Sequence, residues 1–168
     1  EVLAFIWETI KIVPISLAII LPIRYFLVQP FFVKGASMES NFEDGDYIFV
    51  DELSYNFTEP ARGDVIIFRY PVDPSQFFIK RIVGLPDEII EIKNNAVVVY
   101  NREYPNGLFL NESYLDPGQE IIGSSRTKLD DDEYFVLGDN RFHSSDSRRW
   151  GPVQRDMITG RAMIRLWP

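Results

Sequence analysis

An apolar run near the start of the chain is the feature that most constrains its fold: over residues 12–33, Arg24 is the only formal charge. A helix that crosses a bilayer needs roughly 20 mostly apolar residues, and this run supplies that length. Pro14 and Pro22 lie inside it, which is more typical of membrane helices than of helices in soluble proteins. We therefore expect residues 1–29 to form one N-terminal transmembrane helix; the alternative is a buried core helix.

The charges of the chain are distributed unevenly around this run. Lys and Arg number 17 against 25 Asp and Glu, which gives a net charge of −8. Residues 1–36 hold three of the basic residues and two of the acidic ones, so the acidic excess belongs to the remainder. Because an acidic chain binds nucleic-acid phosphates poorly, we expect no nucleic-acid partner. We expect instead a lipid bilayer in contact with the apolar run.

The remaining sequence, residues 30–168, has the pattern of a β domain. Short runs rich in β-branched and aromatic residues alternate with turn residues, as they do in strands. The strands predicted from these runs are 47–50, 65–70, 77–83, 88–93, 96–100, 134–137 and 162–166. Asn94-Asn95 predicts a hairpin turn, and residues 104–130 predict mostly loop. The predicted fold class is mostly β and antiparallel, preceded by the one membrane helix.

Two residue counts narrow the possible chemistry. The chain has no cysteine and one histidine, His143. Without cysteine there is no disulfide, no thiolate nucleophile and no zinc site with Cys ligands, and a single histidine excludes His-His metal motifs. We expect neither a metal nor a cofactor. A Ser-His-Asp mechanism would have to use His143, which precedes Ser144 and lies close to Asp146 in the sequence.

A serine and a lysine are the candidates for catalysis. Ser37 follows two small residues that would let a substrate backbone approach closely, although a Gly-Ala-Ser triplet is equally typical of a tight turn. In the predicted strand 77–83, alternation places Lys80 on one face with Phe78 and Ile82. Burial there would lower the pKa of the amine from about 10.4 toward about 7 to 8, which suits a general base. The alternative is an amphipathic strand whose lysine reaches solvent.

A third polar segment spans residues 138–151. It places hydroxyl, carboxylate and guanidinium side chains between two glycines. Such a run can supply hydrogen bonds and an internal ion pair to a nearby site. The alternative is a polar surface loop.

Together these segments resemble the type I signal peptidases, membrane-bound serine peptidases that remove signal peptides from exported proteins. The resemblance covers nearly the whole chain. It lies in the apolar run and in the motifs at 35–38, 62–65, 80–86, 138–151 and 160–168. It implies a β-rich catalytic domain on the extracytoplasmic side of the plasma membrane, attached by a single span.

The resemblance also implies a role for individual residues. Ser37 matches the nucleophile and Lys80 the general base, and the backbone N–H of Ser37 would be one oxyanion donor. Ser144 matches the serine that orients the lysine, and Asp146 and Arg148 match residues that support that region. The substrates would be preproteins whose signal peptides are cut after small residues in the A-x-A style.

Three positions depart from the family pattern. Residues 40–42 are Ser-Asn-Phe where the family usually has Pro-Thr-Leu, and Asp87-Glu88 stands where it usually has Gly-Asp. Gly35 stands where some members carry a serine whose hydroxyl is an oxyanion donor. The first two departures change turn residues, and the third removes a side-chain donor.

Other interpretations stay open from the residues alone. A membrane-tethered β domain that binds a partner without chemistry would leave the set of Ser37, Lys80 and Ser144 unexplained. A soluble, self-cleaving Ser-Lys peptidase is another possibility, against which the apolar run argues. A triad based on His143 is the third, although a lone histidine is more often structural or exposed.

Overall fold

The computed structural model describes residues 7, 9–19 and 29–166 of the 168-residue chain. Residues 9–19 are helical, and no helix within the described ranges has both the length and the apolar character needed to cross a membrane. Most other residues of the predicted anchor lie outside the described part of the chain, so the transmembrane helix stays a prediction.

Strands dominate the chain after the predicted anchor. In chain order they are β1 (Gln29–Phe32), β2 (Tyr47–Asp51), β3 (Val65–Tyr70), β4 (Asp73–Gly84), β5 (Ile89–Lys93), β6 (Ala96–Tyr100), β7 (Leu108–Phe109), β8 (Ser125–Lys128), β9 (Glu133–Leu137), β10 (Val153–Gln154) and β11 (Ile158–Leu166). The helical elements among them are short, namely η1 (Ser54–Asn56), α2 (Ser147–Trp150) and η2 (Arg155–Met157). The prediction of a mostly β fold is confirmed.

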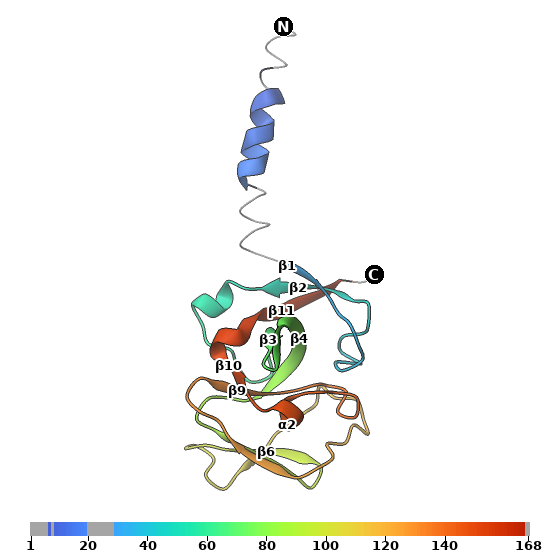
Figure 1. Cartoon of the computed structure of the whole chain (residues 1–168), viewed down its shortest axis with the longest axis vertical. Helices are drawn as coiled ribbons and strands as arrows, with labels where there is room; N and C mark the ends of the chain where they lie inside the picture. Colours follow the sequence, from blue (N-terminus) through green and yellow to red (C-terminus); the bar gives the residue numbers. More distant parts are fainter. Residues whose placement is uncertain (1–6, 8, 20–28, 167–168) are drawn as a thin grey trace.

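The strands form two antiparallel sheets. The larger has seven strands in the order β1-β2-β11-β3-β4-β9-β10, and the smaller has four in the order β7-β6-β5-β8. Figure 1 shows the small sheet, marked by β6, at the opposite end of the domain from β1 and β2. In the large sheet β11 lies between β2 and β3, although it follows all the other strands in the sequence.

The β3–β4 hairpin determines what surrounds the candidate lysine. Its register places Ile66 opposite Lys80 and Phe68 opposite Phe78. These four side chains share one face, because strand residues alternate between faces. Phe68, Ile66 and Ile82 belong to one buried cluster, against which Phe78 packs. Lys80 therefore lies among apolar side chains, as the alternation predicts.

Two further apolar clusters complete the core. One lies between the two sheets, with buried residues Val83, Ile90, Ile92, Val97, Val99, Ile121, Leu129, Phe135 and Leu137. The other lies on the opposite face of β3 and β4, with buried residues Val33, Met38, Ile48, Val50, Val65, Ile67 and Ile79. This second cluster includes Met38, the residue directly after Ser37.

The strand bounds agree with the sequence where the pattern is strong. The bounds of β3 and β6 equal the predicted 65–70 and 96–100, whereas β4 begins at Asp73 instead of residue 77. The sequence does not predict β1, because this strand continues the apolar run and contains Pro30. Pro30 is tolerated in this strand because β1 lies at the edge of the large sheet, where the missing N–H of proline interrupts no hydrogen bonds between strands.

Two turns use left-handed backbone without glycine. Asn94 and Asn95, with φ of 49° and 63°, join β5 to β6 as the predicted hairpin turn. Asp87, one of the departures from the family pattern, has a φ of 64°, which Asp tolerates better than most residues. Its neighbour Glu88 is buried and pairs with Arg62 across 2.6 Å. The turn therefore accommodates both unusual residues.

Gly84 ends β4 where the chain leaves the large sheet, and a Cβ there would lie 2.6 Å from Ile90 Cγ1 and 2.8 Å from Phe135 Cβ. We expect Gly84→Ala to lower the free energy of unfolding by about 1–3 kcal/mol, the usual cost of overpacking a core. Urea unfolding followed by circular dichroism measures this. Ser125→Ala on exposed β8 is the control, with an expected change within about 0.5 kcal/mol. Equal stability of Gly84→Ala and wild type would contradict this packing.

Candidate active site

Ser37 lies in the loop between β1 and β2, and the backbone of this loop is restrained. The Val33 N–H donates to Asp46 O at 2.8 Å, near the ends of the loop. Met38 is fully buried, and the Asn140 N–H donates to the Ser37 carbonyl oxygen at 3.1 Å. The position of the nucleophile candidate is therefore fixed by its buried neighbour Met38 and by the hydrogen bond from Asn140.

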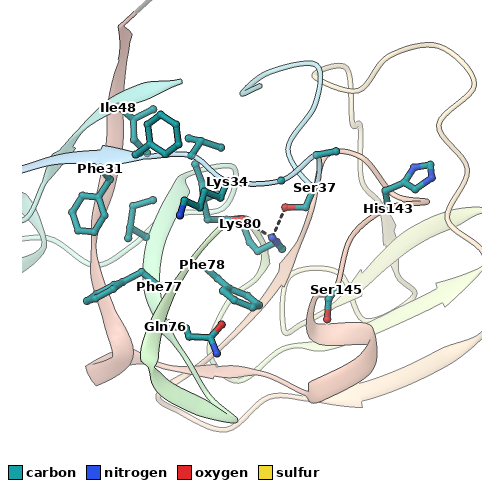
Figure 2. A pocket seen from close by; sticks show the side chains of 16 residues that line it. Phe31, Lys34, Ser37, Ile48, Gln76, Phe77, Phe78, Lys80, His143 and Ser145 are labelled. Atoms are coloured by element: carbon teal, nitrogen blue, oxygen red, sulfur yellow. Dashed lines mark hydrogen bonds between the residues drawn. The ribbon is translucent and has the colours of Figure 1, made fainter. Parts of the chain in front are cut away.

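Lys80 Nζ lies 2.7 Å from Ser37 Oγ and donates a hydrogen bond of 2.7 Å to Ile79 O. Figure 2 shows the two side chains pointing toward each other, and both line the same cleft. Lys80 is only 3% exposed. Burial lowers the pKa of Lys80 to about 8, although the negative charges of Asp146 and Asp139 act in the opposite direction. A neutral amine is therefore accessible near neutral pH, with its lone pair next to a hydroxyl group.

A buried ion pair joins strand β4 to the segment after β9, and Asn41 connects the Ser37 loop to this pair. The Arg81 guanidinium donates to both carboxylate oxygens of Asp139, at 2.8 and 2.6 Å, and the two side chains are 12% and 2% exposed. Asn41 Nδ2 lies 2.9 Å from the same carboxylate and 2.9 Å from Tyr114 O, and donates to both. Arg81 also lies over the Tyr114 ring at 4.1 Å. Asn41, another departure from the family pattern, therefore fixes the loop that follows Ser37.

Asp146 organises the third segment. Its carboxylate accepts from the Arg148 guanidinium at 2.8 Å, from the Arg148 N–H at the start of α2, and from the Gly138 N–H at 3.1 Å. Burial alone would raise the pKa of Asp146, but the hydrogen bonds and charge of Arg148 hold it below its usual range. The carboxylate is therefore ionised at neutral pH and supplies a fixed negative charge near Lys80.

Ser144 lies close to the nucleophile loop. It is 5% exposed, and its hydroxyl faces the Asp146 carboxylate, whose pKa it helps to lower. No hydrogen bond among the described residues joins it to Lys80. A Cβ at Gly138 would clash with the Ser144 hydroxyl and lie 2.5 Å from Ser37 O. The absence of a side chain at Gly138 thus lets Ser144 and the Ser37 loop lie close to this backbone. The contact of Ser144 with Lys80 that the resemblance implies stays a prediction.

The cleft above Ser37 and Lys80 has a volume of about 590 Å³. On one side its lining is apolar and includes Phe31 from β1 and Phe77 from β4, whose ring centres lie 5.6 Å apart. Figure 2 places His143 on the other side of Ser37. An extended peptide with an apolar part could therefore lie across the serine.

His143 is exposed at the rim of this cleft. Its Nδ1 lies 3.3 Å from Asn140 Oδ1, and no hydrogen bond among the described residues joins it to Ser37. The basic group in contact with Ser37 is Lys80. Across residues 29–166 and the short helix before them, no three His, Cys, Asp or Glu side chains are placed to hold a metal ion.

The sequence does not assign the ion pair between Arg81 and Asp139, or its link to Asn41. The two charged residues lie 58 positions apart, and no periodic pattern connects them. The signals that exist are indirect: Arg81 follows Lys80, and Asp139 follows a glycine in a polar segment.

Comparison with known proteins covers almost the entire sequence. The sequence model of the family described as signal peptidase, peptidase S26, matches residues 6–167. The chain is 36% identical to a probable signal peptidase I-1 of Synechocystis sp., over 98% of this chain and 84% of that protein. It is 36% identical to signal peptidase I of Leptolyngbya laminosa, over 96% of this chain and 79% of that protein.

A more distant relative and a solved structure agree with these matches. Signal peptidase IB of Staphylococcus aureus is 29% identical over 96% of this chain and 89% of its own length. The crystal structure of a signal peptidase I from Enterococcus faecalis matches with a TM-score of 0.53 and 28% identity, over 63% of this chain and 98% of that chain. Because the family match spans nearly every residue, the chain belongs to the signal peptidase family, peptidase S26.

Proposed function

We propose that this signal peptidase cleaves signal peptides from exported preproteins with Ser37 as the nucleophile and Lys80 as the general base. The observation that carries the proposal is the contact of 2.7 Å between Lys80 Nζ and Ser37 Oγ on the cleft. A general base must be within hydrogen-bond reach of the proton and have a pKa near the working pH. Lys80, with a pKa of about 8, meets both requirements.

The reaction follows from this pair. Neutral Lys80 takes the proton of Ser37 as Oγ attacks the scissile carbonyl carbon, which gives a tetrahedral intermediate with a negatively charged oxygen. The ammonium then donates that proton to the leaving amine as the peptide C–N bond breaks, leaving an acyl-enzyme. Lys80, neutral again, takes a proton from water, whose oxygen attacks the ester. Breakdown of the second intermediate returns the proton to Ser37 and releases the signal peptide.

The backbone N–H of Ser37 is the proposed donor to the oxyanion. Within the described part of the chain it makes no backbone hydrogen bond, so it is available to a substrate oxygen. Two residues earlier, Gly35 has a φ of 91° and no side-chain donor. The backbone donor therefore carries this stabilisation, and one such donor is typically worth about 10²–10³ in kcat.

Ser144, Asp146 and Arg148 are proposed to support the pair without acting on the substrate. Asp146 and Arg148 hold the segment that contains Ser144 through their charged hydrogen bonds. The buried Ser144 hydroxyl is proposed to orient the amine of Lys80. Charged hydrogen bonds of this kind fix geometry more firmly than neutral ones.

The proposed substrates are signal peptides that end in A-x-A. An extended chain places alternate side chains on the same side, so both alanines would face the cleft. The apolar lining around Phe31 and Phe77 favours such small, apolar side chains before the cut.

We propose that the N-terminal part of the chain anchors the enzyme as a single span in the plasma membrane, with the peptidase domain outside the cytoplasm. The apolar run at residues 12–33 supports this. In the helical residues 9–19, large apolar side chains such as Ile12 and Ile15 are 61% and 59% exposed, which suits contact with lipid. Fractionation of cells that express the full chain tests the proposal, and recovery in the soluble fraction would refute it.

Ser37→Ala and Lys80→Arg test the proposed pair directly. Arginine stays protonated in proteins and cannot act as the base. We expect each variant to lose cleavage of a preprotein with an A-x-A site by at least about 10³-fold, with an unchanged circular dichroism spectrum. Lys128→Arg makes the same exchange at an exposed site on β8 and should keep its activity. Cleavage by Lys80→Arg at the wild-type rate would refute the mechanism.

The burial of Lys80 also predicts how stability depends on pH. The pKa is about 8 in the folded protein and 10.5 in the unfolded chain, so between these values the unfolded state binds one more proton. Wild-type stability therefore rises across this window and is lowest below pH 8. Lys80→Met should raise the free energy of unfolding at pH 7 by up to about 3 kcal/mol and abolish that rise. Urea unfolding between pH 7 and 10 measures both effects; parallel pH curves would show that Lys80 is not buried as described.

His143→Ala separates the lysine mechanism from a histidine triad. We expect a loss in kcat/KM of less than about tenfold, because His143 does not contact Ser37. In both wild type and variant, kcat/KM should fall below a pH of about 8, where Lys80 becomes protonated. With a histidine base, kcat/KM of the wild type would instead fall below a pH of about 6.5. A fall at that pH in the wild type that is absent from His143→Ala would favour the triad.

A further inference from the structure

The charge of the cleft is opposite to that of the chain. The protein has a net charge of −8, yet none of the residues that line the cleft is Asp or Glu. Its lining includes two lysines, Lys34 and Lys80. Lys80 is buried and works in its neutral form, so Lys34 is the permanent charge that a bound peptide meets.

Lys34 is free to interact with a ligand. It is exposed, and it forms neither an ion pair nor a side-chain hydrogen bond with any other residue that the structure describes. Figure 2 shows its side chain on the same side of Ser37 as Phe31 and Phe77, opposite His143. Three residues before the nucleophile, Lys34 is thus at the rim of the apolar half of the cleft.

The apolar half of the cleft suits the residues that precede the scissile bond. Signal peptides of the A-x-A type place two small side chains there, and an extended backbone directs both toward the floor. The residue between them then points away from the floor, toward the rim. A long and flexible lysine at that rim can reach this side chain.

We propose that Lys34 is a specificity-determining residue: its ammonium favours an acidic side chain between the two small residues and disfavours a basic one. This inference rests on the proposed signal-peptide cleavage at Ser37. It adds a charge preference at the position that the A-x-A pattern leaves undefined.

The size of the preference follows from the exposure of the site. In water, two unit charges about 4 Å apart change an equilibrium constant by about fivefold, and an exposed pair gains no more than that. Attraction and repulsion together should therefore separate an acidic from a basic peptide by about tenfold in kcat/KM. Because the pair is exposed, the ratio should shrink toward one at about 1 M salt.

The test uses three peptides that differ only in one residue, with Ala-Asp-Ala, Ala-Asn-Ala or Ala-Lys-Ala before the cut. The measured quantity is the ratio of kcat/KM for the Asp and Lys peptides within each enzyme, so a general loss of activity cancels. We expect a ratio of about 10 for wild type, near one for Lys34→Gln, and below one for Lys34→Glu. Lys128→Glu carries the same charge change on exposed β8 and should keep the wild-type ratio.

The outcomes distinguish this inference from the proposed function. If wild type cleaves the Asn peptide but Lys34→Glu keeps the wild-type ratio, the inference is wrong and the peptidase assignment stands. An equal shift of the ratio in Lys128→Glu and Lys34→Glu would also overturn it, because overall charge would then be the cause. If wild type cleaves none of the three peptides, the proposed function fails and this inference with it.

Discussion

Removal of an ammonium group from water favours loss of its proton, and the proposed chemistry of this site depends on that effect. The β3–β4 hairpin provides the environment by placing Lys80 on one face with Ile66 and Phe78. The carboxylates of Asp146 and Asp139 oppose the shift, which keeps the pKa of Lys80 at about 8 instead of lower. Burial and nearby negative charge thus act against each other. Their balance leaves an amine that can both accept a proton and return it.

The Asp139 carboxylate is the point at which three segments of the chain meet. It binds Arg81, next to the proposed base Lys80, and it binds Asn41, four residues after the proposed nucleophile Ser37. A general base works only when its reach to the nucleophile is fixed within fractions of an ångström. Strand β4, which carries Lys80, could slide or tilt relative to the loop that carries Ser37, and a shared buried carboxylate opposes this. Asn41 differs from the usual family residue, yet in this chain it makes a specific contact with that carboxylate.

The sequence predicted what depends on local order. Strand alternation placed Lys80 on a face with Phe78, and the bounds of β3 and β6 followed from their β-branched residues. Contacts across long separations were not predictable in this way, because a single sequence carries no pattern that joins Arg81 to Asp139. Edge strand β1 escaped prediction because its apolar residues also fit the end of a membrane helix. The proposed roles of Ser37 and Lys80 came from a family resemblance, since spacing alone favoured a lysine that reaches solvent.

The position of β11 affects when Ser37 and Lys80 can come together during synthesis of the chain. Ser37 is held by the β1–β2 hairpin and Lys80 by the β3–β4 hairpin, and β11 is the strand that lies between β2 and β3. Ribosomes make β11 after all the other strands, so a growing chain has no sheet that connects the two hairpins. Pairings of such high sequence separation form late in folding because they require closure of long loops. Until β11 is made, the hairpins that hold Ser37 and Lys80 therefore lack the strand that joins them in the large sheet.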